Sequence, residues 1–230
     1  MPVFDREAQE YDQWYESTMG QFVDEVESKL AFSMLKPQKG MKVLDVGCGT
    51  GNFSIKLSKM GCNVVGVDLS REMLKIAKEK REKEKLDISF DMMDVYDLDF
   101  PDNAFDAVFS MATFEFIKEP ERAYAEMYRV VKPGGRILIG TINKNSSWGR
   151  LYLSREFQEN SVFQYADLKT REDMENLDQN HLVDAKECLF VPPDSEEEDF
   201  TMERERALSR KERGGFICLL YQKPEQPPVK

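Results

Sequence analysis

The sequence has one histidine, few cysteines and no long apolar run. Its four cysteines are scattered without a CxxC pair, and only His181 could complete a metal site with them. We therefore expect reduced thiols and no bound metal. No stretch approaches the roughly 18 to 20 apolar residues of a membrane span, and the first ten residues lack the basic start and apolar core of a secretory signal. These absences predict a cytoplasmic protein that is not inserted into a membrane.

Basic residues are also in the minority. Thirty-two Lys and Arg face 43 Asp and Glu, which gives a net charge of −11 and a pI near 4.8. The summed field repels phosphate backbones and anionic membrane surfaces, so nucleic acid is not expected as a partner. The 230 residues suffice for one α/β domain with a full core and are few for two independent domains.

Apolar patterns typical of strands alternate with patterns typical of helices. Gly61 stands where a helix needs a left-handed cap, Ser70 can cap the next helix, and a further helix follows Pro120. The predicted strands cover 42–47, 63–68, 87–95, 105–113, 136–142, 184–191 and 215–222. The charged stretch between the last two strands is expected to be a solvated linker. Alternation of this kind predicts a doubly wound, Rossmann-like α/β fold with a mostly parallel sheet.

A glycine-rich loop, "KVLDVGCGTGNFS" (42–54), follows the first predicted strand. In open α/β sheets ligands bind at this edge, and glycine lets the backbone turn tightly or approach a ligand. Only Thr50 separates Gly49 from Gly51, so the dinucleotide pattern GxGxxG is not met. Asp45 would repel a pyrophosphate and attract an ammonium or sulfonium group. The loop therefore favours a cationic ligand over a nicotinamide dinucleotide.

Two further acids follow the next strands. Asp68 ends the second strand, where a carboxylate can accept hydrogen bonds from ribose hydroxyls. Asp94 follows the third strand, where an adenine amino group would need an acceptor, although it could simply belong to the polar turn "DVYDLD". Together with Asp45, these acids suggest a nucleoside that carries positive charge. S-adenosylmethionine has a ribose, a sulfonium and an ammonium group.

Four stretches in order along the chain carry a family resemblance. "VLDVGCGTGNFS", "VVGVDLS", "FPDNAFDAVFSMATFEFI" and "EMYRVVKPGGRILIGTIN" resemble the successive motifs of the class I S-adenosylmethionine-dependent methyltransferases. The similarity is to the small-molecule branch that includes the ubiquinone/menaquinone C-methyltransferases. It implies a seven-stranded sheet whose last strand is antiparallel, S-adenosylmethionine as cofactor and S-adenosylhomocysteine as product.

The resemblance also implies roles for matching positions around the cofactor. They are Asp45, Gly47, Cys48 and Gly49 at the methionine moiety, Tyr11 near its carboxylate, Asp68 at the ribose, Leu69, Asp94 and Val95 at the adenine, and Ser110 and Met111 facing the amine and the methyl group. It further implies one domain over 1–230, in which 1–38 form a helical lid, 40–142 the cofactor-binding half, and 143–230 the acceptor-site cap with the last two strands.

The acceptor is expected to lie against aromatic residues of the lid and of the segment after the fifth strand. The candidates for this wall are Trp14, Thr113, Trp148, Arg150 and Tyr152. Alternatively, the N-terminal aromatics only attach the extra helices to the domain, and Arg150 is a surface residue. The main interpretation predicts a small-molecule acceptor as the partner. We expect the protein to be a monomer or a homodimer.

The sequence departs from the family pattern after the fourth strand. Phe114-Glu115-Phe116 stands where the family often has Leu-Glu-His, so a histidine base is missing there, and the Asp/Asn-Pro-Pro-Tyr/Phe motif of amino-directed enzymes is absent. Three side chains remain as candidate bases: Glu115, Tyr15 and His181, the last with a turn residue as the alternative. We expect SN2-like methyl transfer to an N, O, S or C nucleophile. The alternatives are a non-catalytic S-adenosylmethionine sensor or complex subunit, and a dehydrogenase.

Overall fold

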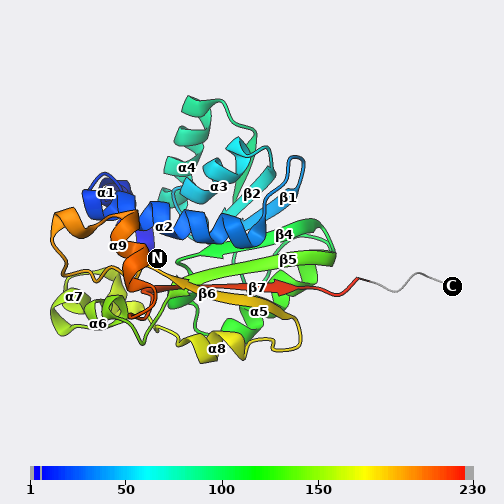
Figure 1. The fold of residues 1–230 in the computed structure, drawn as a ribbon. Coiled ribbons are helices and arrows are strands. Elements are labelled where there is room, and N and C mark those ends of the chain that lie inside the picture. The colour runs from blue at the N-terminus through cyan, green and yellow to red at the C-terminus, as the bar shows by residue number, and fades with distance from the viewer. Residues whose placement is uncertain (1–2, 6, 226–230) are drawn as a thin grey trace.

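The computed structural model describes residues 3–5 and 7–225, and its strands form one mixed sheet (Figure 1). The strands are β1 (Lys42–Val46), β2 (Asn63–Asp68), β3 (Ile88–Met92), β4 (Phe105–Met111), β5 (Val131–Ile142), β6 (Leu182–Cys188) and β7 (Phe216–Gln222). Their order is β3-β2-β1-β4-β5-β7-β6, and β7 is antiparallel to both of its neighbours. The predicted seven-stranded sheet with an antiparallel last strand is thereby confirmed.

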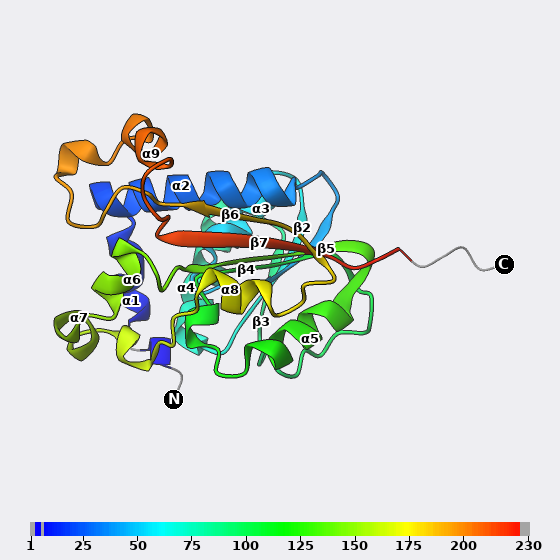
Figure 2. The same cartoon turned by 60° about the horizontal axis from the view of Figure 1, so that its bottom comes forward.

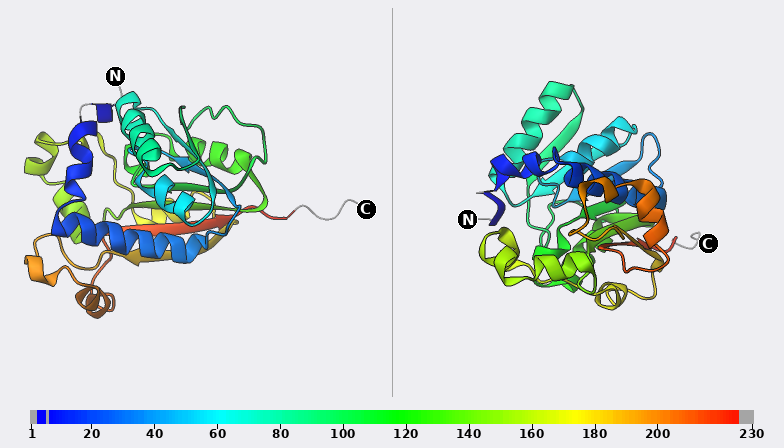
Figure 3. Two further views of the ribbon diagram at one scale, coloured as in Figure 1. Left: turned by 90° about the horizontal axis from the view of Figure 1, so that it is seen from above. Right: turned by 60° about the vertical axis from the view of Figure 1, so that its left-hand side comes forward.

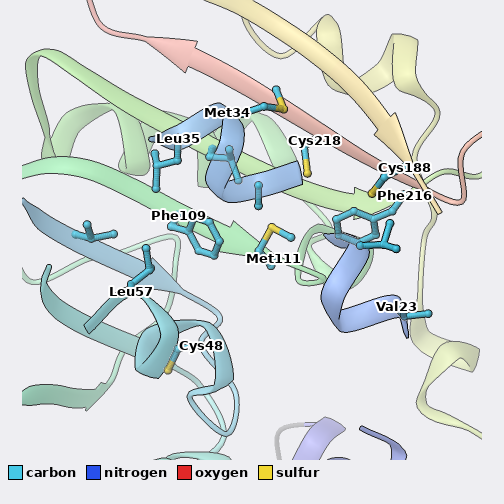
Figure 4. Packing of buried hydrophobic residues seen from close by; sticks show 14 of the residues in the cluster. Val23, Met34, Leu35, Cys48, Leu57, Phe109, Met111, Cys188, Phe216 and Cys218 are labelled. Atoms are coloured by element: carbon cyan, nitrogen blue, oxygen red, sulfur yellow. The ribbon is translucent and has the colours of Figure 1, made fainter. Parts of the chain in front are cut away.

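Helices cover both faces of this sheet. One face carries α2 (Thr18–Leu35), α3 (Asn52–Lys59) and α4 (Arg71–Glu84), and the other carries α5 (Pro120–Val130) and α8 (Arg171–Glu175) (Figure 2). Alternate residues of β4 therefore enter two separate cores: Phe109 packs with α2, as Figure 4 shows, while Val108 packs with α5. Burial on both faces explains why the strands are nearly continuous apolar runs.

The helix signals in the sequence act as expected. The Ser70 hydroxyl accepts a hydrogen bond from the Met73 amide and caps α4, and Gly61 has a φ of 89° just after α3. The expected start of the fifth strand was wrong. Strand β5 begins at Val131 rather than at 136, so it contains the glycine-rich stretch "KPGG", with Gly134 at a φ of 77°. A register shift opposite Phe105 and Ala107 accommodates the glycines in the strand.

The predicted linker before β7 contains two helices instead. They are η4 (Glu197–Asp199) and α9 (Met202–Leu208). The buried Glu205 carboxylate of α9 accepts hydrogen bonds from the amides of Leu189, Phe190 and Val191, at 2.6, 2.7 and 3.1 Å. An acid in a charged sequence run thus anchors the chain after β6, which ends at Cys188 rather than at 191.

The remaining helices gather at the carboxyl ends of the parallel strands (Figure 3). They are η1 (Val3–Asp5), α1 (Ala8–Trp14), η2 (Phe114–Phe116), α6 (Ser147–Tyr152), α7 (Arg155–Glu159) and η3 (Val162–Tyr165). The strand order reverses between β1 and β4, and this is where open α/β sheets form ligand sites. Within the described residues, no helix is long and apolar enough to cross a bilayer.

Candidate active site

Two adjacent cavities lie at the carboxyl ends of β1, β2 and β4. The inner cavity, of about 60 Å³, is lined mainly by the glycine-rich loop, Asp45 and Asp68. The outer cavity, of about 420 Å³, lies between the N-terminal helices and the segment after β5. Both are lined by Phe4, Tyr11, Tyr15 and Ala112. The two cavities therefore share a wall made largely of N-terminal aromatic side chains.

The glycine-rich loop is shaped by left-handed backbone at three positions. Gly47, Gly49 and Gly51 have φ values of 69°, 52° and 82°, a region that strains residues with a Cβ. A Cβ on Gly47 would come within 2.3 Å of the Thr113 side chain, whereas one on Gly49 would meet nothing within 4 Å. The Thr113 hydroxyl donates to the carbonyls of Gly47 and Met111. Thr113 thus braces the loop and is absent from the lining of the outer cavity, where we had expected it.

Asp68 closes the loop from the end of β2. One carboxylate oxygen accepts a hydrogen bond from the Gly49 amide at 2.9 Å, and the other accepts one from the Ser70 amide at 2.8 Å. Burial raises the pKa of Asp68, while these amide donors oppose the shift. Its side chain is therefore held in one orientation at the edge of the inner cavity.

Asp45 lies beneath the loop and is almost fully buried. Its carboxylate accepts a hydrogen bond from the Ser54 hydroxyl at 2.6 Å. Burial raises the pKa of Asp45 to about 7, with a further contribution from the nearby Asp68 carboxylate. A cation in the inner cavity would stabilise the ionised form of this group.

The stability of the unliganded protein should reflect this shift. The pKa of the Asp45 carboxyl is about 7 in the folded state and about 3.8 in an unfolded chain. Between these two pH values the folded state therefore binds more protons than the unfolded state. The free energy of unfolding should fall as pH rises through that window, by about 4 kcal/mol more in the wild type than in Asp45→Asn. Urea denaturation at several pH values measures both curves, and parallel curves would contradict the assignment.

The N-terminal segment is joined to the loop by hydrogen bonds and an ion pair. The Asp12 carboxylate accepts from the Thr50 hydroxyl at 2.8 Å and pairs with Lys80 at 2.6 Å. The Ser70 hydroxyl donates to the Asp5 carboxylate at 2.6 Å. Five polar side chains from distant parts of the sequence thus hold η1 and α1 against the inner cavity, and none of these pairs could be predicted from the sequence.

Tyr11 of α1 and Tyr15, which caps the end of that helix, stand between the two cavities. Their hydroxyl oxygens are 3.3 Å apart. Burial raises the pKa of Tyr11 to about 12 and raises that of Tyr15 well above its usual value, so both phenols are neutral at physiological pH. Each can donate a hydrogen bond but is a poor base in its resting state.

Aromatic residues are the most frequent kind in the wall of the outer cavity. Its aromatic lining residues are Phe4, Tyr11, Trp14, Tyr15, Phe116, Trp148, Tyr152, Phe157, Phe163 and Phe216. Tyr152 stacks on Phe163 with ring centroids 4.3 Å apart. The Trp148 indole donates to the Val191 carbonyl at 2.8 Å, which fixes its orientation. Trp14, Trp148 and Tyr152 thus lie where we predicted the acceptor wall, whereas Arg150 is exposed and outside it.

Of the expected cofactor residues, most line the inner cavity. Those that do are Tyr11, Asp45, Gly47, Cys48, Gly49, Asp68 and Met111. Leu69, Asp94 and Val95 follow the ends of β2 and β3 beyond that lining; Leu69 is half exposed, and Asp94 accepts from the Tyr96 amide within its turn. Ser110 is fully buried, and its hydroxyl donates to the Val46 carbonyl, so it supports β1 from below the cavity.

Among the candidate bases, Glu115 and Tyr15 line the outer cavity and His181 does not. His181 precedes β6, whose first residue pairs with Tyr221 at the amino-terminal part of β5. Its ring binds the Asp178 carboxylate at 2.6 Å and packs on Tyr128. The structure therefore does not bring His181 to either cavity and places it just before β6, in keeping with the turn residue that we gave as its alternative.

Among the residues of the outer cavity that sequence reasoning missed, one is a buried acid. Glu27 is 9% exposed and lines the cavity from α2. The signal was present, since Glu27 lies four residues after Val23 and four before Ala31, both buried on the apolar side of the same helix. Burying an acid within such an apolar stripe costs free energy unless the carboxyl has a partner, so its position points to a function.

The chemistry of the inner cavity fits a cationic nucleoside. Asp45 and Asp68 line it, and no Lys, Arg or His is found among its described lining residues. The open space over Gly49 leaves room for a ligand close to the backbone. The donor set thus suits a ribose and a positively charged group, as in S-adenosylmethionine.

Comparison with known proteins agrees with this chemistry. A family model described as "Methyltransferase domain" matches residues 44–139. A ubiquinone biosynthesis O-methyltransferase of Coxiella burnetii (strain Dugway 5J108-111) is 37% identical over 107 residues, 46% of each chain. An uncharacterized protein of Methanocaldococcus jannaschii is 36% identical over 152 residues, 66% of this chain and 67% of that one. The chain thus spans less than half the length of the Coxiella relative.

A solved structure from Thermotoga maritima has the same fold. It is described as a SAM-dependent methyltransferase and possible histamine N-methyltransferase, with a TM-score of 0.75, 24% identity, and coverage of 96% of this chain and 98% of that one. The chain belongs to the class I S-adenosylmethionine-dependent methyltransferases. S-adenosylmethionine is the cofactor that this family uses, and the acid-lined inner cavity is suited to it.

Proposed function

We propose that this protein transfers the methyl group of S-adenosylmethionine to a nucleophilic N, O, S or C atom of a small molecule held in the outer cavity. The observation that carries the proposal is the shared wall: an acid-lined cavity beside the glycine loop adjoins an aromatic cavity of about 420 Å³. That volume lies within the usual range of small-molecule sites. A donor and an acceptor bound in adjacent cavities would meet near Ala112 and the two tyrosines.

In this proposal each residue of the inner cavity has a binding role. Asp68 would accept hydrogen bonds from the ribose hydroxyls, and Asp45 would stabilise positive charge beside the Gly47–Gly49 backbone. Leu69, Asp94 and Val95 would border the adenine at the ends of β2 and β3, and Met111 would lie toward the reacting centre. The cofactor supplies an activated methyl group, so the protein mainly needs to align the acceptor and exclude water.

We further propose that residues 1–38 serve as a lid on one domain, over the cofactor-binding half (40–142) and the acceptor cap (143–230). The inner cavity, of about 60 Å³, is small for a nucleoside. Cofactor access would then require η1 and α1 to move away from the loop. The bonds of Asp5 and Asp12 to Ser70 and Thr50 are polar and partly exposed, so they can break and re-form in water.

Methyl-labelled S-adenosylmethionine tests the proposed reaction. The protein is incubated with labelled cofactor and fractionated metabolites of its host, and we expect label in a discrete small molecule. Asp68→Ala serves as the control and should give none. Binding of S-adenosylhomocysteine without any transfer, across all fractions, would favour a non-catalytic sensor or complex subunit instead.

A further inference from the structure

The outer cavity contains a buried carboxylate whose second oxygen has no partner. Glu115 is fully buried, and its Oε1 accepts from the Thr141 hydroxyl at 2.9 Å and the Ile142 amide at 2.5 Å. Its Oε2 is buried and accepts no hydrogen bond from any described residue. A buried charged oxygen without a donor costs free energy, so this atom is suited to a donor that arrives with a ligand.

A second buried carboxylate lines the same cavity. Glu27 projects from α2, and among the described residues none hydrogen-bonds to its side chain or forms an ion pair with it. Burial raises the pKa of both carboxyls, and the charge of Glu115 raises that of Glu27 further. Because both carboxylates line one cavity, their charges would repel each other when both are ionised.

Two nearby cations offset the repulsion only in part. Lys56 lowers the pKa of Glu27, and Lys169 lowers that of Glu115. Each lysine already has an acidic partner, however, since Lys56 is bound to Asp24 and Lys169 to Asp167. Among the described residues that line the outer cavity, none is Lys, Arg or His. A ligand that brought one positive charge would offset the repulsion, whereas an anionic ligand would add to it.

The rest of the cavity suits an apolar cation. Trp14, Trp148 and the stacked pair Tyr152 and Phe163 supply aromatic surfaces. Aromatic faces attract ammonium groups, and the attraction grows when water is excluded. The same rings would pack on the hydrocarbon part of a ligand.

We propose that the acceptor is an amine carried on an apolar or aromatic body, with its ammonium group bound by Glu27 and Glu115. This inference rests on the proposed methyl transfer. The ammonium first passes one proton to a carboxylate, which leaves a neutral amine with a free electron pair. That pair forms the new N–C bond to the methyl group as the C–S bond breaks, and the bonding electrons remain on sulfur. Glu27 and Glu115 thus recognise the amine and take up its proton.

Binding of matched probes tests the inference. With S-adenosylhomocysteine bound, tryptamine and 2-phenylethylamine are compared by calorimetry with their neutral counterparts, tryptophol and 2-phenylethanol, and with the anion indole-3-acetate. We expect each amine to bind at least about tenfold more tightly than its alcohol, with the anion weakest. Equal or undetected binding of amine and alcohol in both pairs would overturn the inference.

Variants show whether the two carboxylates cause the preference. Glu115→Gln and Glu27→Gln should each reduce the advantage of the amine over the alcohol about tenfold, with binding of S-adenosylhomocysteine retained as the sign of a folded protein. Glu25→Gln, on the exposed side of the same helix, should leave the advantage unchanged. If the amine still binds more tightly than the alcohol in both cavity variants, the inference is overturned, but the proposed function is not. Failure of the wild type to bind S-adenosylhomocysteine would instead overturn the proposed function on which it rests.

Discussion

Replacing Asp68 by alanine should weaken the binding of S-adenosylhomocysteine about 100-fold or more. The carboxylate would lose its proposed bonds to the ribose, and charge-assisted hydrogen bonds contribute about 1.5 to 3 kcal/mol each. The same substitution frees the Gly49 and Ser70 amides that Asp68 now binds, so the loop would also lose its shape. Titration calorimetry of the wild type and the variant measures the difference.

Asp106→Ala is the matched control for this experiment. Asp106 also accepts a hydrogen bond from a backbone amide, that of Lys42 at 2.7 Å, and forms an ion pair with Lys132 at 2.5 Å. It is the second residue of β4, however, at the end of the strand opposite the cavities. We expect a modest loss of stability and unchanged binding. If Asp68→Ala bound the ligand like the wild type, the assignment of the inner cavity would be wrong.

Gly47→Ala should destabilise the unliganded protein by about 3 kcal/mol. Left-handed backbone costs alanine about 1 kcal/mol, and a Cβ within 2.3 Å of Thr113 adds the cost of overpacking, about 2 kcal/mol. Urea denaturation without cofactor measures this loss directly. The comparison isolates the folding effect of the loop from its role in binding.

Gly49→Ala and a second substitution provide the controls for this prediction. Gly49 has a φ of 52° but open space around its Cβ position, so we expect a loss of only about 1 kcal/mol. Adding Thr113→Gly to Gly47→Ala removes the clashing side chain. In that background Gly47→Ala should lower the free energy of unfolding by only about 1 kcal/mol, measured as the difference between Thr113→Gly alone and the double variant. Equal losses for the two single glycine variants would show that the contact with Thr113 does not matter.

Local signals predicted much of the fold. The Ser70 cap, Gly61 after α3 and the apolar runs of the strands depend on neighbouring residues, which the sequence displays directly. Two errors arose where tertiary structure overrode such signals. The glycines of "KPGG" lie within β5 because Gly134 and a register shift let the strand continue. The charged residues 202–208 form a helix because Glu205 finds three backbone amides after β6.

The sequence predicted one part of the candidate site, the cofactor loop, but not the contacts of the N-terminal segment. The glycine loop, Asp45 and Asp68 come from one βα unit and the strand after it, so their positions follow from strand order. The partners of the N-terminal segment could not be predicted in this way, since Asp12 and Lys80 meet only after α1 folds back over α4. His181 looked like a candidate base because it is the single histidine, yet it lies at the other end of the sheet.

By itself, the sequence determined the α/β class, the glycine loop and the acidic character of the cofactor site, because these depend on residue type and on spacing within a few turns of chain. Only the tertiary structure decided which side chains share the outer cavity. Glu27 and Glu115 are far apart in the sequence and come from a helix on one face of the sheet and a turn after β4. The two side chains are buried because segments distant in the sequence pack together, and the order of these segments along the chain does not reveal which of them are in contact.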